Sequence, residues 1–225
     1  KKYITDWMLN YGNNCWMSLF YNNHDNPRMV SKISTDPKYT EAIEKLLAVM
    51  QMTLKGTPFV YQGDEMGLVN YVFESPDEPT DVEAKGYVAE LREKGKSEEE
   101  ILKTINAGTR EHTRILLPWN EYPEDMREGL RQEINENITK TYKDLIALRK
   151  NDKTLVYGDF EIINDKKDRF VYSRTLNGTT YVIDCNLGKK QQKSYIPEGY
   201  KPAFLSKNSI CHELSPYEVR IWCKK

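Results

Sequence analysis

The polar run Tyr21–Arg28 carries the side chains best suited to chemistry on a hydroxyl-rich molecule. An imidazole such as His24 donates hydrogen bonds and a carboxylate such as Asp25 accepts them, so the pair can grip hydroxyl groups. Arg28 enlarges the same polar cluster. A turn between a strand and a helix uses similar residues, because Asn and Asp cap helices and Pro suits turns. From residue types and spacing alone we favour the turn.

Two other polar groups are candidates for a site. Asp64 and Glu65 are adjacent carboxylates that could perform acid/base work, although capping a helix or binding loop amides is the commoner use. Arg110 and Arg114 precede Trp119 in an irregular segment. Arginine with tryptophan is a common sugar-contacting pair, and equally a common packed loop. Neither group decides the function by itself.

The elements around these residues predict a parallel sheet. Trp16–Tyr21 is a compact apolar run typical of a buried strand, and Tyr39–Leu54 has the apolar stripe of a helix. Phe59–Gln62 then predicts a second strand. Strand, helix and strand at this spacing form a βαβ unit, in which ligands are handled at the carboxyl ends of the strands. The polar run that starts at Tyr21 follows the first of these ends.

A highly charged segment, about Ser75 to Asn120, follows the second strand and predicts a loop elaboration. Within it we expect exposed helices at Glu83–Lys94 and Ser97–Ile105, the second with Ser97 as N-cap and Glu100 three residues later. A further amphipathic helix is expected at Glu133–Lys150.

The pattern changes after residue 152 to short β-rich runs separated by turns. The dipeptide Asn177-Gly178 is a strong hairpin signal. We therefore expect an α/β segment over residues 1–152 and a small antiparallel β domain over residues 153–225. The expected strands are Thr154–Tyr157, Phe160–Ile163, Arg169–Thr175, Thr179–Asp184 and Glu218–Trp222.

Composition excludes several classes of protein. A hydrophobic share of 39% with 11% aromatic residues argues against disorder. The 33 basic and 34 acidic side chains give a net charge of -1, which offers no reason to expect nucleic acid or an anionic membrane as partner. No apolar run approaches the roughly 20 residues that span a bilayer. The four cysteines have no CxxC spacing, so we expect reduced thiols in a cytoplasmic protein, with no metal and no cofactor.

Together, three motifs resemble the α-amylase superfamily of glycoside hydrolases. Residues 19–28 (LFYNNHDNPR) are similar to the family's fourth conserved region, at the end of the seventh barrel strand. Residues 56–67 (GTPFVYQGDEMG) are similar to its eighth strand. Arg110, Arg114 and Trp119 keep the spacing of a motif that ends the charged excursion in oligo-1,6-glucosidases, although the residues between them differ.

The resemblance implies the C-terminal portion of a (β/α)8 barrel followed by a small antiparallel β-sandwich domain. It implies that Asp25 is the third catalytic carboxylate, which binds and distorts the sugar, and that His24 hydrogen-bonds sugar hydroxyls. Arg114 resembles the arginine that reaches the terminal glucose, and Arg28 would be a structural or subsite residue near it. The reaction would be retaining hydrolysis of α-glucosidic bonds, first of all α-1,6 bonds, in short oligosaccharides.

The family's nucleophile and general acid lie on earlier strands, and neither of their motifs occurs here. We therefore expect the chain alone to be inactive and to need the N-terminal part of the barrel as a partner. Because a partial sheet leaves its edge uncovered, we expect the isolated piece to dimerise, rearrange or lean on its β domain. The alternatives are a maltase, a trehalose-6-phosphate hydrolase, a non-catalytic glucosidase-like module of the kind found in amino-acid transporter heavy chains, and a stand-alone carbohydrate-binding or interaction piece.

Overall fold

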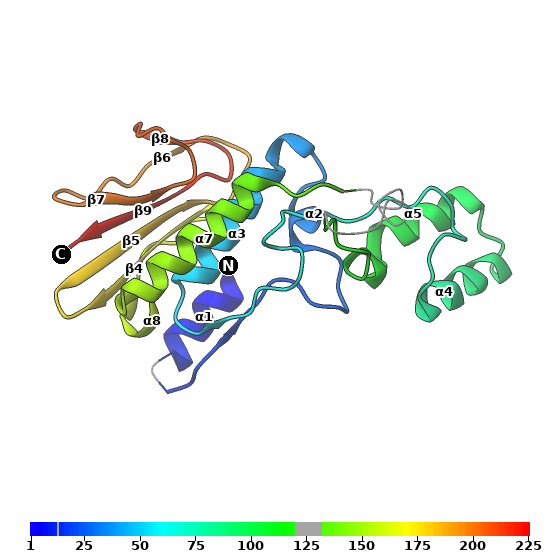
Figure 1. The fold of residues 1–225 in the computed structure, drawn as a ribbon, viewed down its shortest axis with the longest axis horizontal. Helices are drawn as coiled ribbons and strands as arrows, with labels where there is room; N and C mark the ends of the chain where they lie inside the picture. The colour runs from blue at the N-terminus through cyan, green and yellow to red at the C-terminus, as the bar shows by residue number, and fades with distance from the viewer. Residues whose placement is uncertain (13, 120–131) are drawn as a thin grey trace. The chain divides into compact units, whose positions relative to one another are not determined.

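A computed structural model describes residues 1–12, 14–119 and 132–225 (Figure 1). The described residues form two compact units, each assembled from separate stretches of the chain. The first unit comprises residues 1–20, 36–59 and 137–225, and the second comprises residues 21–35 and 60–136. Neither unit coincides with the predicted division at residue 152, and that division into a barrel segment and a β domain stays a prediction.

The first unit begins with helix α1, Lys2–Tyr11, and contains a βαβ motif. Strand β1, Ser18–Leu19, leads to helix α3, Pro37–Thr53, and the chain then returns as strand β2, Thr57–Pro58. The two strands pair in parallel, as the sequence predicts. Within the described residues they form a two-stranded sheet and no closed barrel.

The predicted strand Phe59–Gln62 is wrong in its position. Pairing ends at Pro58, and the chain then turns where the Asp64 carboxylate accepts the backbone N–H of Tyr61 at 3.1 Å. The Gln51 amide binds the carbonyls of Leu19 and Phe59 at 3.0 and 2.7 Å, which satisfies backbone oxygens at the ends of both strands. The first predicted strand is likewise shorter than expected, with Ser18 and Leu19 alone paired.

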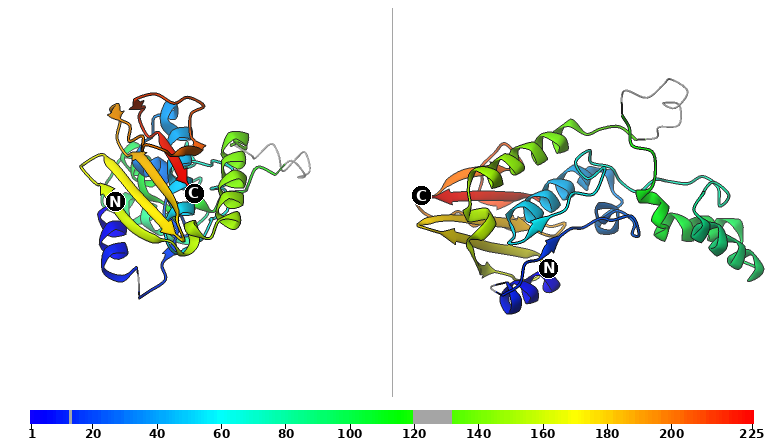
Figure 2. Two further views of the ribbon diagram at one scale, coloured as in Figure 1. Left: turned by 90° about the vertical axis from the view of Figure 1, so that its left-hand side faces the viewer. Right: turned by 60° about the horizontal axis from the view of Figure 1, so that its bottom comes forward.

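The rest of the first unit is an antiparallel β structure with two helices. Helix α7, Glu136–Asn151, precedes the short helix α8, Thr154–Tyr157, which contacts β4 and β5, whereas α3 contacts β9. The sheets run in the orders β3-β4-β5-β9-β7 and β6-β8 (Figures 1 and 2). The strands are β3 Asp159–Asn164, β4 Arg169–Leu176, β5 Thr179–Asn186, β6 Gln192–Lys193, β7 Lys201–Leu205, β8 Glu213–Leu214 and β9 Val219–Lys224.

The hairpin prediction at Asn177-Gly178 is confirmed. Both residues have positive φ, 50° and 84°, and Leu176 pairs with Thr179 across a two-residue turn. The predicted strand Thr154–Tyr157 is wrong, since this segment is α8. The Asp152 carboxylate accepts the N–H of Thr154 at 2.9 Å and so starts a helical turn.

Two buried arginines hold the carbonyl ends of α3 and α8. Arg174 donates to Thr53 O, to Leu155 O at 3.0 Å, to Val156 O at 3.3 Å and to Gly158 O at 2.8 Å. Arg149 donates to Met52 O at 2.8 Å, Leu54 O at 3.1 Å, Leu155 O at 2.7 Å and Gly56 O. Because the last carbonyls of a helix lack partners inside it and carry its negative dipole end, a cation is well placed there. The pair therefore ties the βαβ motif to the β structure.

The second unit contains helix α2, Met29–Ile33, helix α4, Val82–Glu93, helix α5, Glu98–Gly108, and the 3-10 turn η1, Arg110–Thr113. The prediction for α5 is confirmed in detail, because Ser97 and Glu100 form a reciprocal capping box. A small core of Phe73, Val88, Ile101 and Ile105 packs α4 against α5. This core fixes the two helices that precede the η1 turn in sequence.

In the part of the chain that the structure describes, no helix is long and apolar enough to cross a membrane. All four cysteines are free, with Cys185 buried and Cys15 and Cys211 exposed.

Candidate functional site

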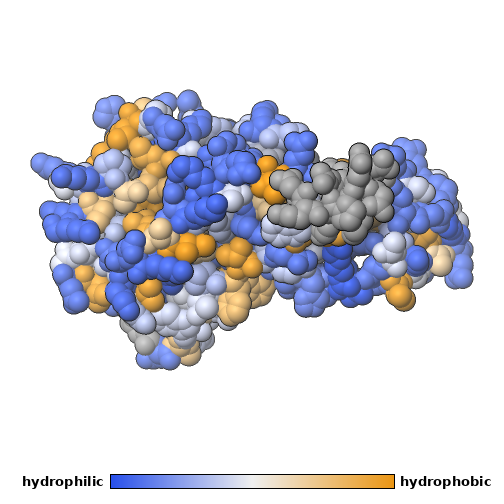
Figure 3. All heavy atoms as spheres, viewed as in Figure 1, coloured by the Kyte–Doolittle hydropathy of each residue, from blue (hydrophilic) through white to orange (hydrophobic). Residues whose placement is uncertain are grey.

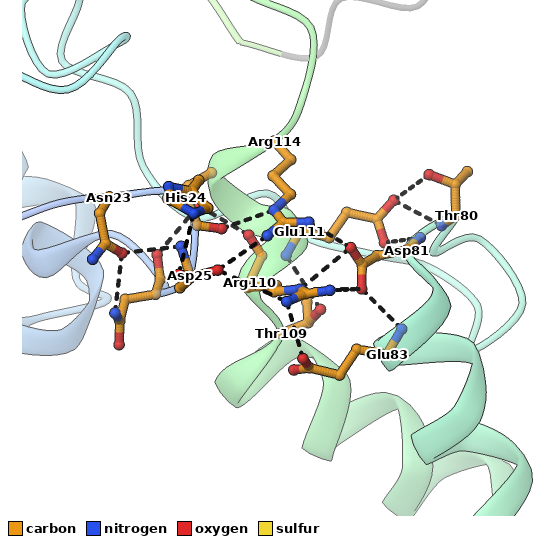
Figure 4. Close-up of polar contacts among 12 residues, drawn as sticks. Asn23, His24, Asp25, Thr80, Asp81, Glu83, Thr109, Arg110, Glu111 and Arg114 are labelled. Carbon is orange, nitrogen blue, oxygen red and sulfur yellow. Dashed lines mark hydrogen bonds and ion pairs between the residues drawn. The ribbon is translucent and has the colours of Figure 1, made fainter.

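Asp25 lies at the centre of a polar cluster in the second unit (Figure 4). Its side chain is 51% exposed, and one carboxylate oxygen lies 3.1 Å from Arg114 Nη2 and 3.8 Å from Arg110 Nη1. The other oxygen lies 3.2 Å from His24 Nε2. The structure therefore brings together three of the predicted site residues, His24, Asp25 and Arg114, around one accessible carboxylate.

The loop that presents Asp25 is shaped by two asparagines. Asn23 Oδ1 accepts hydrogen bonds from the Asp25 N–H and from the Asn26 amide, both at 3.0 Å. The buried Asn22 amide accepts from the Met29 N–H at 2.7 Å and donates to Asp64 at 2.8 Å. The segment is therefore a side-chain-stabilised turn that leads into α2, as its residue types predict. The same turn leaves His24 and Asp25 facing solvent.

Arg28 lies beneath the turn and is fully buried. Its guanidinium donates to Asp64 Oδ1 at 3.2 Å and to the Gln62 carbonyl at 3.1 Å, 5.9 Å from the centre of the Tyr61 ring. Its backbone N–H donates to the Asn70 side chain at 2.7 Å. These contacts tie the Tyr21–Arg28 run to the Tyr61–Gly67 turn. A direct substrate contact by Arg28 stays a prediction, and its burial favours the structural role.

The adjacent carboxylates Asp64 and Glu65 hold loops in this structure. Asp64 accepts from Asn22, Arg28 and the Tyr61 N–H, and Glu65 accepts from the Gly63 N–H at 3.0 Å. Burial raises the pKa of Asp64 to about 6, and the hydrogen bond from Asn22 and the charge of Arg28 oppose this effect. The sequence left two uses open for these residues, acid/base work and the binding of helix ends or loop amides. The contacts fit the second use.

Arg110 and Arg114 are joined by a residue that the sequence argument overlooked, Asp81 (Figure 4). Arg114 Nη1 lies 2.7 Å from Asp81 Oδ2, and its Nε donates to the His24 carbonyl at 2.8 Å. Arg110 Nη2 donates to Asp81 Oδ1 at 3.0 Å, and its Nη1 reaches Glu83 Oε2 at 3.1 Å. The hydrogen bond from Arg110 is the first cause of a lowered pKa at Asp81. Asp81 thus orients the guanidinium of Arg114 toward Asp25.

Glu111 fixes Asp81 in turn. It is buried, and it accepts hydrogen bonds from the N–H and hydroxyl of Thr80, at 2.7 and 2.8 Å, and from the Asp81 N–H at 3.1 Å. The only sequence signal for Asp81 is its place as N-cap of α4, which does not reveal that two arginines bind it. Trp119 is 41% exposed, and its expected sugar contact stays a prediction. Asn120, the end of the predicted excursion, lies outside the described residues.

The cluster is equipped to bind rather than to break a bond. It offers one exposed carboxylate acceptor beside an imidazole and a guanidinium, which together recognise hydroxyl groups. Retaining hydrolysis of a glycoside requires a second carboxyl group about 5 Å away across the bond, whereas the described contacts of the Asp25 carboxylate are with nitrogen donors. Across the described ranges, no group of three or more His, Cys, Asp or Glu could hold a metal ion.

Comparison with known proteins shows which family this chain is similar to. A family model described as "Alpha amylase, catalytic domain" matches residues 1–158. The chain is 30% identical over 239 residues to a glucan 1,6-alpha-glucosidase of Streptococcus pneumoniae, which covers 97% of the chain and 44% of the relative. It is also 30% identical over 254 residues to an oligo-1,6-glucosidase of Halalkalibacterium halodurans, across 100% of the chain and 45% of that relative. The chain therefore spans less than half the length of these relatives.

A solved structure agrees as well. The crystal structure of Bacillus licheniformis trehalose-6-phosphate hydrolase matches with a TM-score of 0.85 at 27% identity. The match covers 99% of this chain and 46% of that one. The predicted architecture, the C-terminal portion of a barrel followed by an antiparallel β domain, is thus confirmed.

Proposed function

The chain belongs to the alpha-amylase family, and from this premise we propose that it provides the sugar-gripping half of an α-glucosidase active site. Its relatives are named glucan 1,6-alpha-glucosidase, oligo-1,6-glucosidase and trehalose-6-phosphate hydrolase. The proposed reaction of the whole enzyme is retaining hydrolysis of α-glucosidic bonds in short oligosaccharides, with α-1,6 bonds preferred. Maltase and trehalose-6-phosphate hydrolase activities are the alternatives within the same class.

The observation that carries the proposal is the setting of Asp25. Its carboxylate is half exposed and lies beside His24 and Arg114. An ion pair with Asp81 fixes the Arg114 guanidinium in this position. An acceptor and two donors on one accessible surface match the hydroxyls of a sugar ring. In this role Asp25 binds and distorts the sugar, and His24 strengthens its hydrogen bond as positive charge develops on the ring. Arg114 holds the terminal glucose.

The nucleophile and the general acid belong to a part of the barrel outside these residues. Large hydrophobic side chains beside β1 and β2 support a further partner there, since Trp16, Phe20 and Phe59 are 46%, 52% and 54% exposed. Apolar side chains next to the short parallel sheet are well suited to packing against further barrel strands. Hydrophobic patches also interrupt the hydrophilic face drawn in Figure 3. We propose that the remaining barrel covers this surface, and that in its absence a second copy of the chain does so.

The test compares two proteins, the 225-residue chain and a chimera in which the upstream part of the S. pneumoniae relative precedes it. We expect the chain alone to leave an aryl α-glucoside intact and the chimera to hydrolyse it. Isomaltose and maltose, assayed side by side, report the linkage preference. Asp25→Asn in the chimera should lower kcat/KM on the order of a hundred-fold or more, because the carboxylate acts on the transition state. Asp165→Asn, an exposed position outside the site, is the matched control.

Turnover by the chain alone that Asp25→Asn abolishes would contradict the proposed division of labour. A chimera that unfolds cooperatively yet hydrolyses no α-glucoside would favour the non-catalytic module instead. The free cysteines support the cytoplasmic location that completes the proposal.

A further inference from the structure

A groove of about 600 Å³ crosses one face of the five-stranded sheet in the first unit. Its floor consists of small side chains from β4 and β5, among them Ser173, Thr175 and Thr180. One wall is formed by β3 and the other by the segment that contains Tyr195, which precedes β7. The volume falls in the range of pockets that enclose small molecules.

Strand register explains the hollow. Ser173 pairs with Glu161 on one side and with Val182 on the other, and Thr175 pairs with Thr180, so these side chains share one face. The bulky neighbours Tyr172 and Arg174 point to the opposite face, as alternation requires. Serine and threonine between larger wall residues leave space above the strands. The floor is therefore low and carries hydroxyl groups, two of which lie 3.1 Å apart on Thr175 and Thr180.

Buried charged side chains fix the backbone of the wall that carries Tyr195. The carboxylate of Asp184, which is fully buried, accepts the Tyr195 N–H at 2.7 Å and the Ser194 hydroxyl at 3.1 Å. Arg169 pairs with the same carboxylate, and Arg220 donates to the Ser194 hydroxyl at 3.1 Å. A surface tyrosine on such a fixed backbone is pre-organised, so a ligand that stacks on it need not order the segment first.

A tight turn extends this wall. The Tyr200 N–H donates to the Pro197 carbonyl at 3.4 Å, and Gly199 has a φ of 78°, which a residue with a side chain adopts at a cost. The turn places Glu198 at an exposed position of the lining. Tyr200, also in the lining, packs on the cluster of Val171, Val182 and Trp222. The wall thus offers the exposed ring of Tyr195 and a carboxylate, and the packed Tyr200, with Lys224 Nζ 5.9 Å from its ring centre, supports the wall.

The chemistry of the lining selects the class of ligand. Two carboxylates, Glu161 and Glu198, accept hydrogen bonds, the floor hydroxyls both donate and accept, and the tyrosines offer apolar ring faces. No lysine or arginine is among these described lining residues, and the nearby Lys224 Nζ, 5.9 Å from the centre of the Tyr200 ring, leaves the two carboxylates in excess, so the groove is not built for an anion. A sugar has a polar edge of hydroxyls and an apolar face of C–H groups, which this combination matches.

We infer that the groove is a second oligosaccharide-binding site, separate in sequence from the Asp25 cluster, in which a neutral glucose chain stacks on Tyr195 and is hydrogen-bonded by Glu198 and the floor hydroxyls. The site holds substrate or product chains on the β structure and performs no chemistry. It therefore does not require the chain to be catalytic.

Isothermal titration calorimetry of the 225-residue chain with isomaltotriose and maltotriose tests the site. We expect Tyr195→Ala to weaken binding about two- to ten-fold, the effect of one lost aromatic contact, and Tyr195→Phe to retain most of the affinity. Glu198→Ala, at an exposed turn position, should also weaken binding without affecting folding. Tyr3→Ala removes another exposed tyrosine, from α1, and should leave the affinity unchanged.

Each variant is also measured in the Asp25→Asn background, which separates this groove from the proposed active site. Loss of binding on Tyr195→Ala in both backgrounds, with little change between low and high salt, supports the inference. Equal affinity of Tyr195→Ala, Glu198→Ala and the unmodified chain would overturn it. It would also be overturned if Tyr195 and Glu198 affected only the salt-sensitive binding of a lysine-rich peptide, since the groove would then be a site for cationic protein segments.

Discussion

Replacing Arg174 by methionine should destabilise the first unit by about 3 kcal/mol. The guanidinium is fully buried and donates to the carbonyls of Thr53, Leu155, Val156 and Gly158. Because Arg149 also donates to the Leu155 carbonyl, removing Arg174 leaves three carbonyls, those of Thr53, Val156 and Gly158, without a charged donor, and each of these costs about 2 kcal/mol. Methionine fills a similar volume, so a large cavity term is not expected.

Part of this loss is recovered. Burial lowers the pKa of Arg174 to about 10, with the nearby charge of Arg149 acting in the same direction. A decrease of this size corresponds to about 3 kcal/mol of unfavourable burial of the charge, which the neutral methionine avoids. The hydrogen bonds lost at three carbonyls, about 6 kcal/mol together, outweigh this relief about two to one, and the remainder is the predicted destabilisation.

Thermal unfolding followed by circular dichroism measures the effect. A change of 3 kcal/mol in a chain of this size lowers the melting temperature by roughly 6–12 °C. Arg174→Lys keeps the charge with fewer donors and should lie between methionine and the unmodified chain. Arg92→Met is the matched control, because Arg92 forms solvent-exposed ion pairs with Asp77 and Glu98, and pairs of this kind contribute little to stability. Equal melting temperatures for Arg174→Met and the unmodified chain would refute the reasoning, as would an equally large loss in Arg92→Met.

The further predictions concern one carboxyl group and two glycines. Because the pKa of Asp64 is raised to about 6 in the native state, the native protein binds more protons than the unfolded chain at intermediate pH. The contribution of this group to the free energy of unfolding is therefore complete below about pH 4 and is lost as the pH rises through 6; a carboxyl 13C resonance of Asp64 that titrates below pH 4 would contradict this. Gly56→Ala should destabilise the βαβ motif by more than about 2 kcal/mol, because Gly56 has a φ of 148° and a Cβ there would lie 2.3 Å from the Met17 carbonyl oxygen. Gly86 lies in α4 with open space around it, so Gly86→Ala should stabilise its helix by about 0.5–1 kcal/mol. Chemical denaturation should therefore show a lower free energy of unfolding for Gly56→Ala and a higher one for Gly86→Ala.

Local signals in the sequence predicted much of the fold. The hairpin at Asn177-Gly178 and the capping box at Ser97 depend on residues within a few positions of one another, and both are confirmed. The α3 helix lies within two residues of its predicted bounds, because its apolar stripe and its breakers are local too. Pairing of Ser18 with Thr57 in parallel followed from the spacing of strand, helix and strand.

The errors come from interactions between distant residues. Thr154–Tyr157 has the composition of a strand, yet a helical turn forms, because Arg149 and Arg174 bind its carbonyls and the Asp152 carboxylate accepts the Thr154 N–H. The β propensity of a short segment is weak compared with several hydrogen bonds from buried cations. Such a clamp cannot be read from the segment itself.

The candidate site shows the same limit. His24, Asp25 and Arg114 could be proposed together because their motifs resemble those of a known family, while residue types alone favoured a turn. Asp81 belongs to no motif. It matters because it binds both arginines in space, although it is more than 25 positions from each of them in sequence. Arg28 illustrates the converse, because its place in the motif says nothing about its burial against Asp64.

The division of the chain into two interleaved units has a consequence for how this protein can change. The second unit consists of residues 21–35 and 60–136. Each of these segments begins and ends at a residue that adjoins the first unit in sequence, so each is an insertion into the chain of the first unit. The entropy of closing a flexible loop grows only with the logarithm of its length, so each doubling costs about 0.6 kcal/mol. The charged helices α4 and α5 lie within the longer of these insertions and carry their own core and caps. Insertions or exchanges in this segment can therefore reshape the surroundings of Asp25 at little thermodynamic cost to the framework that the buried arginines hold together.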